Sequence, residues 1–529
     1  MNPFNAAFLV GRLVRLLFAA ALLSLAACAG LPARTPETVP PASHAIADPA
    51  GTALGKIAAE ALPDHSTSAF RLLPLAASAY EARIELARQA QRTLDVQSFV
   101  FNGDRTGAYL LGALRDAAER GVRVRLLIDD LHSDSVEPLL SDLAAFDGVE
   151  VRLINPFVRA RGSNTSKLLT SLDQLPRVNH RMHNKLFAAD NALAVFGGRN
   201  IGDEYFMRAT HGGNFVDLDL LSAGQVVRDL SAAFDDYWNS DYAWPIDLIV
   251  KPRSTRQERR QRFDARLAEV QAPPPDLGVP ARLAQFATVP DELRTGRVRM
   301  VSASAQVLAD PAAKLGGANV ADRTGTVRAG IGQAMGSAQS EVFVVSPYFV
   351  PGEIGMRVTE QNSRRGVHLR LLTNSLAATD EPAVHAGYMA YRKEMVSIGA
   401  EVYELSPTLA RQQARLGRFG ESTGALHAKV IVIDQSRLFV GSMNLDGRSE
   451  RYNTELGVLI DSPALAHEFL SMMDFESSTY RLRLGPDGEL QWVHGSGANQ
   501  VVLDREPEVG VLRQMMSRLI GGLLPQDWL

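Results

Sequence analysis

Two segments of this chain carry a histidine, a lysine, an aspartate and an asparagine at identical spacing. The eight residues are His183, Lys185, Asp190 and Asn200 in the first segment and His427, Lys429, Asp434 and Asn444 in the second. Each member of the second set lies 244 residues after its counterpart. Imidazole attacks or transfers protons near neutral pH, and lysine and amide donors suit the oxygens of a phosphate. The repeated pattern therefore predicts phosphoryl chemistry at one site built from both segments.

Two other interpretations of these segments are weaker. A metal site needs converging imidazole, thiolate or carboxylate ligands, and lysine is a poor ligand. The sequence contains neither an HExxH motif nor a cysteine cluster. A histidine that only satisfies a backbone group is common, but the same set recurring in equivalent places argues against that role. We expect no metal and no cofactor.

The aspartates of the two segments are expected to be structural. Side chains alternate between the faces of a strand, so His183 and Lys185 point the same way. Asp190 lies five residues beyond Lys185, in a stretch typical of a hairpin turn, where an aspartate bonds neighbouring backbone amides. The same reasoning applies to Asp434, and Asn200 and Asn444 return to the site from the following strand.

The rest of the chain repeats in the same order. "RGVRVRLLIDD" (Arg120–Asp130) matches "RGVHLRLLTNS" (Arg365–Ser375), and "GVEVRLINP" (Gly148–Pro156) matches "GAEVYELSP" (Gly399–Pro407). Short β-branched runs alternate with helical patterns within each copy, which indicates an α/β lobe with a largely buried sheet. The sequence predicts a duplicated α/β domain.

The doubled HxKxxxxD pattern, each copy followed after six residues by G-[GS]-x-N, resembles the phospholipase D superfamily. Within that superfamily the chain is most similar to the bacterial cardiolipin synthases of the C type. The segments that carry this similarity are "GGRNIGDEYF" (Gly197–Phe206), "LLTNSLAATDEPAVHAGYMAYRK" (Leu371–Lys393) and "LPQDWL" (Leu524–Leu529). The resemblance implies two pseudo-symmetric phospholipase D-like lobes, each a mixed β-sheet flanked by helices, with the active site at the lobe interface.

The resemblance also implies roles for individual residues. His183 is the expected nucleophile of a phosphohistidine intermediate, and His427 is the expected acid and then base. Asp217 and Glu455 are candidates to orient the histidines, with ordinary strand-edge acids as the alternative, since their spacings from the preceding asparagines differ. Ser442 stands where the first copy has Gly198, so a phosphate donor at Ser442 has no counterpart there.

The reaction that the resemblance implies is the transfer of a phosphatidyl group to phosphatidylglycerol, which yields cardiolipin, with phosphatidylethanolamine as donor. A hydrolase of the same fold, acting on lipid in preference to nucleic acid, is the alternative. A non-catalytic lipid-binding protein would not need two titratable histidines. The sequence does not identify a protein partner.

The charge balance argues against nucleic acid as the main partner. The whole chain has 55 lysines and arginines, 59 acidic residues and a formal charge of −4. Removal of residues 1–27 takes away Arg12 and Arg15 and brings the charge to −6. Binding to phosphate backbones needs a basic face, so no nucleic acid is expected.

The N-terminus resembles a bacterial lipoprotein signal. Two arginines precede the apolar run Leu16–Ala27, which is too short to span a bilayer, and "LAAC" ends at Cys28, the only cysteine of the chain. Lipidation of Cys28 would place the protein on a periplasm-facing bacterial membrane. Ala29 in the following position favours the outer membrane over the inner, by resemblance to known sorting rules. Five prolines between Leu31 and Ala50 predict an extended tether.

The predicted organisation has six parts: residues 1–27 (signal), 28–66 (tether), 67–250 (first lobe), 251–290 (basic connecting segment), 291–480 (second lobe) and 481–529 (C-terminal segment). Residues 251–270 are expected to form a surface helix. Two Arg-rich stretches, 159–167 and 411–421, suggest basic rims or merely solvated loops. The apolar stripe from Leu512 to Leu524 predicts an amphipathic helix that packs on the second lobe or lies on a membrane.

Overall fold

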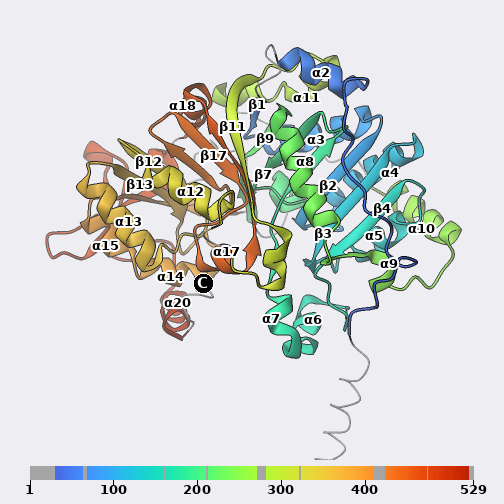
Figure 1. Ribbon diagram of the computed structural model, residues 1–529. Helices are drawn as coiled ribbons and strands as arrows, with labels where there is room; N and C mark the ends of the chain where they lie inside the picture. The colour runs from blue at the N-terminus through green and yellow to red at the C-terminus, as the bar shows by residue number, and fades with distance from the viewer. Residues whose placement is uncertain are drawn as a thin grey trace, which may run out of the picture.

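The computed structural model describes residues 30–62, 68–159, 161–209, 213–270, 281–320, 323–409, 423–473 and 475–523. Two lobes lie side by side, one blue to green and the other yellow to red in Figure 1. The predicted signal and Cys28, the stretch 411–421 and the closing residues 524–529 lie outside the described residues.

The first lobe is built on a mixed sheet whose neighbouring strands follow the order β10, β4, β3, β2, β6, β7, β9, β1. Strands β2, β3 and β4 are parallel, and the other pairs are antiparallel. The strands are β1 (Ser68–Leu73), β2 (Thr93–Val100), β3 (Arg123–His132), β4 (Val149–Ile154), β6 (Leu186–Ala189), β7 (Leu193–Gly197), β9 (Asp219–Gly224) and β10 (Ala243–Pro245).

The second lobe repeats this order as β20, β14, β13, β12, β16, β17, β19, β11, and β21 and β22 extend the edge beyond β20. The strands are β11 (Val301–Ala309), β12 (Glu341–Val345), β13 (His368–Asn374), β14 (Glu401–Leu405), β16 (Val430–Ile433), β17 (Arg437–Gly441), β19 (Leu456–Asp461), β20 (Thr479–Leu484), β21 (Leu490–His494) and β22 (Val501–Leu503). The matching order confirms the predicted pair of pseudo-symmetric α/β lobes.

The two sheets are joined edge to edge. Strand β11 pairs antiparallel with β19 of its own lobe and with β1 of the first lobe, where Ser68 lies opposite Ala303. Backbone hydrogen bonds therefore continue from one lobe into the other and fix their relative position.

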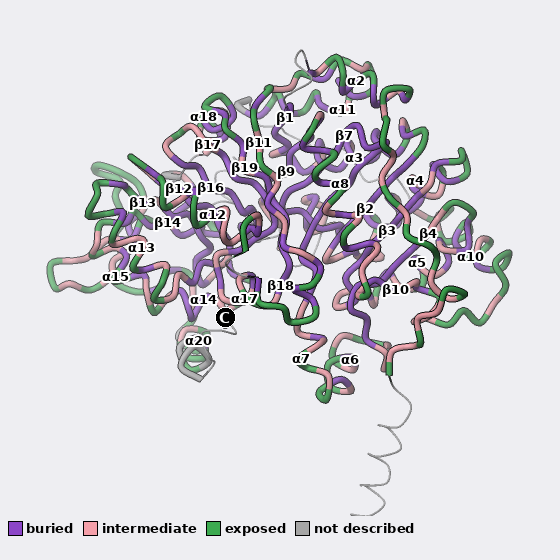
Figure 2. Tube along the Cα trace, in the orientation of Figure 1, coloured by how far each residue is buried: buried purple, intermediate pink, exposed green. Residues whose placement is uncertain are grey.

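Helices cover the sheets. The longer ones are α2 (Ala53–Ala61), α3 (Ala76–Gln89), α4 (Arg105–Glu119), α8 (Gln225–Trp238), α10 (Arg256–Ala268), α12 (Val327–Gly336), α13 (Gly352–Arg364), α14 (Pro382–Met389), α18 (Pro463–Met472) and α20 (Val511–Leu523). The shorter ones are α5 (Glu137–Leu143), α6 (Asn164–Thr170), α7 (Leu175–Val178), α9 (Ile246–Ile249), α11 (Val289–Thr295), α15 (Arg392–Ser397), α17 (Gly447–Arg451) and α19 (Phe475–Ser478). Figure 2 shows that the strands between them are mostly buried. No helix among the described residues has the length and apolar character needed to cross a membrane.

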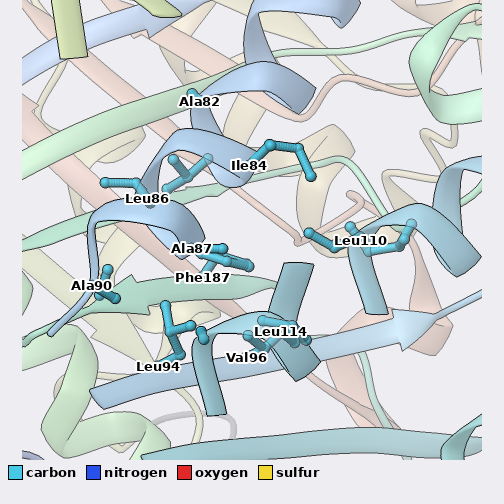
Figure 3. Close-up of a cluster of buried hydrophobic side chains, with 14 of the residues drawn as sticks. Ala82, Ile84, Leu86, Ala87, Ala90, Leu94, Val96, Leu110, Leu114 and Phe187 are labelled. Atoms are coloured by element: carbon cyan, nitrogen blue, oxygen red, sulfur yellow. The ribbon is translucent and has the colours of Figure 1, made fainter. Parts of the chain in front are cut away.

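The packing of two helices differs between the lobes. In the first lobe Ile84 of α3 and Leu110 and Leu114 of α4 are buried together over the sheet (Figure 3). The shared "RGV" sequence and the matching aspartate turns place Gly332, Gly355 and Thr359 at the corresponding positions of the second lobe. A cavity of about 380 Å³ lies there, between α12 and α13. Three large side chains replaced by smaller ones explain the cavity.

Residues 30–62 do not form the extended free tether that the sequence predicts. Between residues 30 and 62 the chain is packed on the first lobe: Arg34 donates to the carbonyl of Ala243 at 2.7 Å, and the carbonyl of Ser43 accepts from Arg125 at 2.7 Å. The segment ends in α2, whose Leu54 is fully buried. The prolines do impose extended backbone, but polar groups of the first lobe hold that backbone in place.

The connecting segment contains the expected helix, α10. Arg259 and Phe263 are buried on its inner side. Arg259 donates to the carbonyl of Ser141 and pairs with Asp247 at 2.8 Å. The helix therefore packs against α5 of the first lobe instead of being solvated on all sides.

Candidate active site

Each HxK segment is held by a strand of the opposite lobe. Strand β5 (Arg181–Met182) pairs with β18 (Asn453–Thr454), and β15 (Thr423–Leu426) pairs with β8 (Gly213–Val216). At the end of these pairs the amide of His183 donates to the carbonyl of Thr454 at 2.9 Å. The amide of His427 donates to the carbonyl of Val216 at 2.8 Å. The two histidines are therefore positioned by contacts that exist only when the lobes meet.

The carboxylates that contact the histidines are also exchanged between lobes. His183 Nδ1 lies 2.8 Å from Glu455 Oε2, and His427 Nδ1 lies 2.6 Å from Asp217 Oδ2. All four side chains are buried. The carboxylate fixes the proton on Nδ1, which leaves Nε2 of each ring free to attack or to carry a proton.

The two lysines lie close to both histidines. Lys185 Nζ donates to the carbonyl of His183 at 2.6 Å, and Lys429 Nζ donates to that of His427. Burial, with the charge of the other lysine, lowers the pKa of Lys185 to about 7. Burial lowers the pKa of Lys429 to about 8, against the opposing effect of Asp217. Buried cations without a full counter-charge suit an anionic ligand.

The two histidine pairs are not electrostatically equivalent. Burial lowers the pKa of His427 to about 4, while Asp217 acts to raise it. Burial and the charges of both lysines lower the pKa of His183 well below its usual value. Burial works to raise the pKa of Asp217, but His427 and Lys429 outweigh it and hold the pKa at about 2. Burial raises the pKa of Glu455. The pKa of the carboxylate beside His427 is thus lowered, and that of the carboxylate beside His183 is raised.

Gly198 and Ser442 differ because their carboxylates differ. A Cβ atom on Gly198 would lie 2.1 Å from Asp217 Oδ1, so only glycine leaves room for this carboxylate. Ser442 Oγ donates to Glu455 Oε2 at 2.5 Å and accepts from the amide of Leu456 at 3.0 Å. The serine therefore holds Glu455 and is not directed at a substrate phosphate.

The asparagines lie in the loops after β7 and β17. Asn200 is buried, and its Oδ1 accepts from the amide of Val100 at 3.1 Å. Asn444 is buried, and its Oδ1 has no hydrogen-bond partner among the described residues. The structure thus brings the histidines, lysines, asparagines, Asp217, Glu455 and Ser442 to the lobe interface.

Asp190 and Asp434 lie apart from the histidines, in hairpin turns. The Asp190 carboxylate accepts from the amides of Gln91, Arg92 and Thr93 at 2.7–3.2 Å, and Asp434 accepts from three equivalent amides. Both aspartates have positive φ, +52° and +50°. These contacts connect the hairpins to the start of β2 and β12.

Sequence reasoning missed the aromatic side chains around the histidines. Phe99 lies edge-on to His183 with ring centroids 4.9 Å apart, and Phe215 and Tyr205 lie 5.1 Å and 5.3 Å from His427. Their apolar surface excludes water from the imidazoles. The available signals were Tyr205 within "GGRNIGDEYF" and Phe215 two residues before Asp217, a spacing that an ordinary strand also shows.

The basic residues of the predicted rim, 159–167, form hydrogen bonds and ion pairs within the protein. Arg161 pairs with Asp130 at 2.6 Å, and fully buried Lys167 donates to the carbonyl of Asp130 at 2.9 Å. These charges stabilise the loop and are not a solvent-facing rim.

Tyr388, which lies near His385 on α14, belongs to a buried network. Tyr388 Oη donates to Glu404 at 2.9 Å, and Arg392 pairs with Glu404 and Glu506 at 3.2 Å and 2.5 Å. His385, Glu404 and Glu506 form a group of metal-ligand type, but the Arg392 guanidinium binds both carboxylates.

Comparisons with known proteins agree with this geometry. A family described as cardiolipin synthase, PLD-like domain, matches residues 84–238 and 331–475, one span in each lobe. Cardiolipin synthase C of Escherichia coli (strain K12) is 35% identical over 469 residues, which covers 87% of this chain and 96% of the relative. Cardiolipin synthase A of Pseudomonas syringae pv. syringae is 25% identical over 412 residues, covering 78% of this chain and 69% of the relative.

The solved phosphatidylserine synthase of Haemophilus influenzae Rd KW20 shares the fold, with a TM-score of 0.54. Its sequence identity is 14%, and the match covers 88% of this chain and 96% of that one.

Proposed function

Because the chain belongs to the cardiolipin synthase family with phospholipase D-like domains, we propose that it is a phosphatidyltransferase that makes cardiolipin. The acceptor is the free hydroxyl of phosphatidylglycerol. The observation that carries the proposal is the pair of buried histidines, each bound to a carboxylate of the opposite lobe, beside two buried lysines. Two histidines, one attacking and one transferring protons, are what a two-step transfer at phosphorus requires.

The reaction proceeds through a phosphohistidine. Nε2 of His183 attacks the phosphorus of the donor lipid, a P–N bond forms, and the P–O bond to the headgroup breaks. His427 gives a proton to the departing alkoxide. In the second step His427 takes the proton of the phosphatidylglycerol hydroxyl, its oxygen attacks phosphorus, and the P–N bond breaks. Lys185, Lys429 and the asparagines stabilise the charge on the non-bridging oxygens.

The electrostatic asymmetry supports this assignment of roles. A nucleophile must be unprotonated, and His183 has its pKa lowered well below the usual value. A general acid must hold a proton; burial lowers the pKa of His427 to about 4, so His427 takes up its proton when the charges of Asp217 and of the bound phosphodiester together raise that pKa. The negative charge of a bound phosphodiester further raises the pKa of the histidine that it faces.

The identity of the donor and the location of the protein complete the proposal. The resemblance to the C type favours phosphatidylethanolamine as donor. The sequence "LAAC" favours a lipid anchor at Cys28, on a periplasm-facing membrane and preferentially the outer one. Processing that stops with globomycin and is lost in Cys28→Ser would support the anchor, and globomycin-insensitive processing would contradict it.

The test uses the purified chain with labelled phosphatidylethanolamine and phosphatidylglycerol in vesicles, without added metal. Formation of cardiolipin supports transfer, phosphatidic acid alone indicates a hydrolase, and no product contradicts an enzymatic role. His183→Ala and His427→Ala should each abolish turnover. His467→Ala is the matched control because His467 is exposed on α18.

A further inference from the structure

The exposed apolar side chains of the described chain are concentrated on two elements. Eight of the eleven large hydrophobic residues that are exposed there lie on α20 or in the segment that runs from α6 through α7. They are Leu512, Met515, Met516 and Leu519 on the first element and Leu168, Leu169, Leu172 and Leu175 on the second. Single exposed apolar residues are normal, but contiguous groups mark an interaction surface.

Helix α20 is attached through its polar side. Arg513 donates to the carbonyl of Thr379 at 3.0 Å, and buried Ser517 donates to the carbonyl of Pro382 at 3.1 Å. The four apolar residues on its other side are between 54% and 73% exposed. A helix that packed as part of a core would have the opposite arrangement. The residues of the predicted stripe whose side chains the structure describes, Leu512, Met515, Met516 and Leu519, therefore do not pack on the second lobe.

The α6–α7 segment shows the same inversion. Lys167 is fully buried, and its Nζ donates to the carbonyl of Asp130 and to Ser133 Oγ at 2.9 Å and 3.1 Å. The four leucines of this segment are between 39% and 64% exposed. Both elements thus place polar groups inward and apolar groups outward.

The two elements project from the same edge of the molecule. Helix α20 belongs to the second lobe and α6 and α7 to the first, and all three reach the lower edge of the view in Figures 1 and 2. The described chain also begins there, because Leu31 lines one cavity together with Pro176 and Arg177 of α7. Cys28, the predicted lipidation site, precedes the first described residue, Gly30, by two residues.

Both elements are connected to the catalytic centre. Helix α7 ends at Val178, and β5 follows it directly and leads to His183. In the second lobe, α20 contacts Thr379, and the next residue along the chain is Asp380. The Asp380 carboxylate accepts a hydrogen bond from Tyr348 at 2.7 Å, and its negative charge acts to raise the pKa of Lys429. The apolar elements therefore flank the site from both lobes.

We propose that α20 and Leu168–Leu175 form a two-part docking surface that inserts into the interfacial region of a phospholipid bilayer. Residues 511–523 contain no acidic residue, and Arg518 adds a positive charge to that of Arg513, which binds the carbonyl of Thr379; the net positive charge of the helix complements anionic headgroups. Insertion at both elements brings the lobe interface down to the headgroups, where the reacting phosphates are. Only the choice of a phospholipid surface as the occupant rests on the proposed function.

Site-specific labelling tests insertion directly. In the full chain with Cys28→Ser no native cysteine remains, so an environment-sensitive dye can be placed by Leu169→Cys, Leu519→Cys or Ala464→Cys. Ala464 is exposed on α18, at the opposite edge of Figure 1, and serves as the control. On vesicles of phosphatidylglycerol and phosphatidylethanolamine, the dyes at 169 and 519 should shift to shorter wavelength and the dye at 464 should not. Unshifted dyes at 169 and 519 would overturn the proposal and leave a protein partner as the occupant.

Activity separates the docking surface from the catalytic function. Leu169→Asp with Leu172→Asp, and Met515→Asp with Leu519→Asp, remove two apolar side chains from each element. Each pair should lower turnover on vesicles by about tenfold, a loss of about 1.4 kcal/mol in partitioning. Turnover on monomeric short-chain phosphatidylethanolamine and phosphatidylglycerol should not change. Wild-type turnover on vesicles in both variants would contradict the docking surface. Absence of turnover in the unsubstituted chain would contradict only the proposed function, because the dye shifts do not depend on catalysis.

Discussion

A methyl group added at Gly198 in the first lobe should impair the function of His427 in the second lobe. In Gly198→Ala the new Cβ would lie 2.1 Å from Asp217 Oδ1 and 2.8 Å from its Cγ, well inside van der Waals contact. The φ angle of Gly198 is not positive, so alanine strains no backbone torsion there, and the carboxylate is the group that must move.

The size of the effect follows from the geometry. Relief of the contact requires a displacement of about 1 Å, which stretches the 2.6 Å contact between Asp217 Oδ2 and His427 Nδ1 beyond hydrogen-bonding distance. A hydrogen bond to a charged group contributes about 1.5–3 kcal/mol. Its loss in the transition state corresponds to a roughly 10- to 100-fold decrease in kcat. The acid step should be affected more than lipid binding, so KM should change little.

The assay is cardiolipin formation in vesicles at saturating phosphatidylglycerol, with thermal melting to verify folding. Gly332→Ala is the matched control, because a Cβ at Gly332 meets nothing within 4 Å. Ser442→Gly should be milder than Gly198→Ala, since it removes one hydrogen bond to Glu455 without displacing the carboxylate. Wild-type kcat in Gly198→Ala would refute the reasoning.

Three further predictions follow from the same contacts. The pKa values of Lys185 and Lys429 are about 7 and about 8, so both side chains lose their protons as the pH rises from about 7 to about 9. We therefore expect kcat/KM to fall over this range, and a flat profile would contradict a role for the charge of the two lysines. Asp434→Ala removes the acceptor of three backbone amides at the start of β12, so it should lower the melting temperature and leave kcat of the folded protein nearly unchanged. Thermal melting and kinetics, measured on the same variant, check this. Gly332→Leu replaces a helical glycine and fills part of the cavity between α12 and α13, so the free energy of unfolding should rise by about 1–2 kcal/mol; an unchanged or lower melting midpoint would contradict this account of the cavity.

The sequence predicted the site's members because the chain is duplicated. A lone His183 has several explanations, whereas His183 and His427 in identical surroundings have few. The exchange of carboxylates between the lobes was not predictable from the sequence. Asp217 follows Asn200 and Glu455 follows Asn444, and this order suggests that each carboxylate contacts the histidine of its own lobe. The exchange comes from the short pairs β5–β18 and β8–β15, which form only between folded lobes.

Two other differences have a common physical origin. Proline spacing predicts extended backbone between Leu31 and Ala50 but does not show whether Arg34 and Ser43 find partners on the first lobe. The periodicity of α20 predicts an amphipathic helix but does not show which side faces the protein, and Ser517 determines that. In both segments the local pattern fixes the backbone, and tertiary hydrogen bonds determine where it lies.

The exchange of carboxylates also explains why the two halves need not be identical. Each half supplies a histidine to one reaction and an acid to the other half's histidine. A symmetric pair of identical lobes would give both histidines the same carboxylate and therefore the same proton affinity. Within one duplicated chain, Gly198 with Asp217 and Ser442 with Glu455 can diverge separately. This divergence lowers the pKa of the carboxylate beside His427 and raises that of the carboxylate beside His183, and a two-step transfer needs one histidine that carries a proton and one that does not.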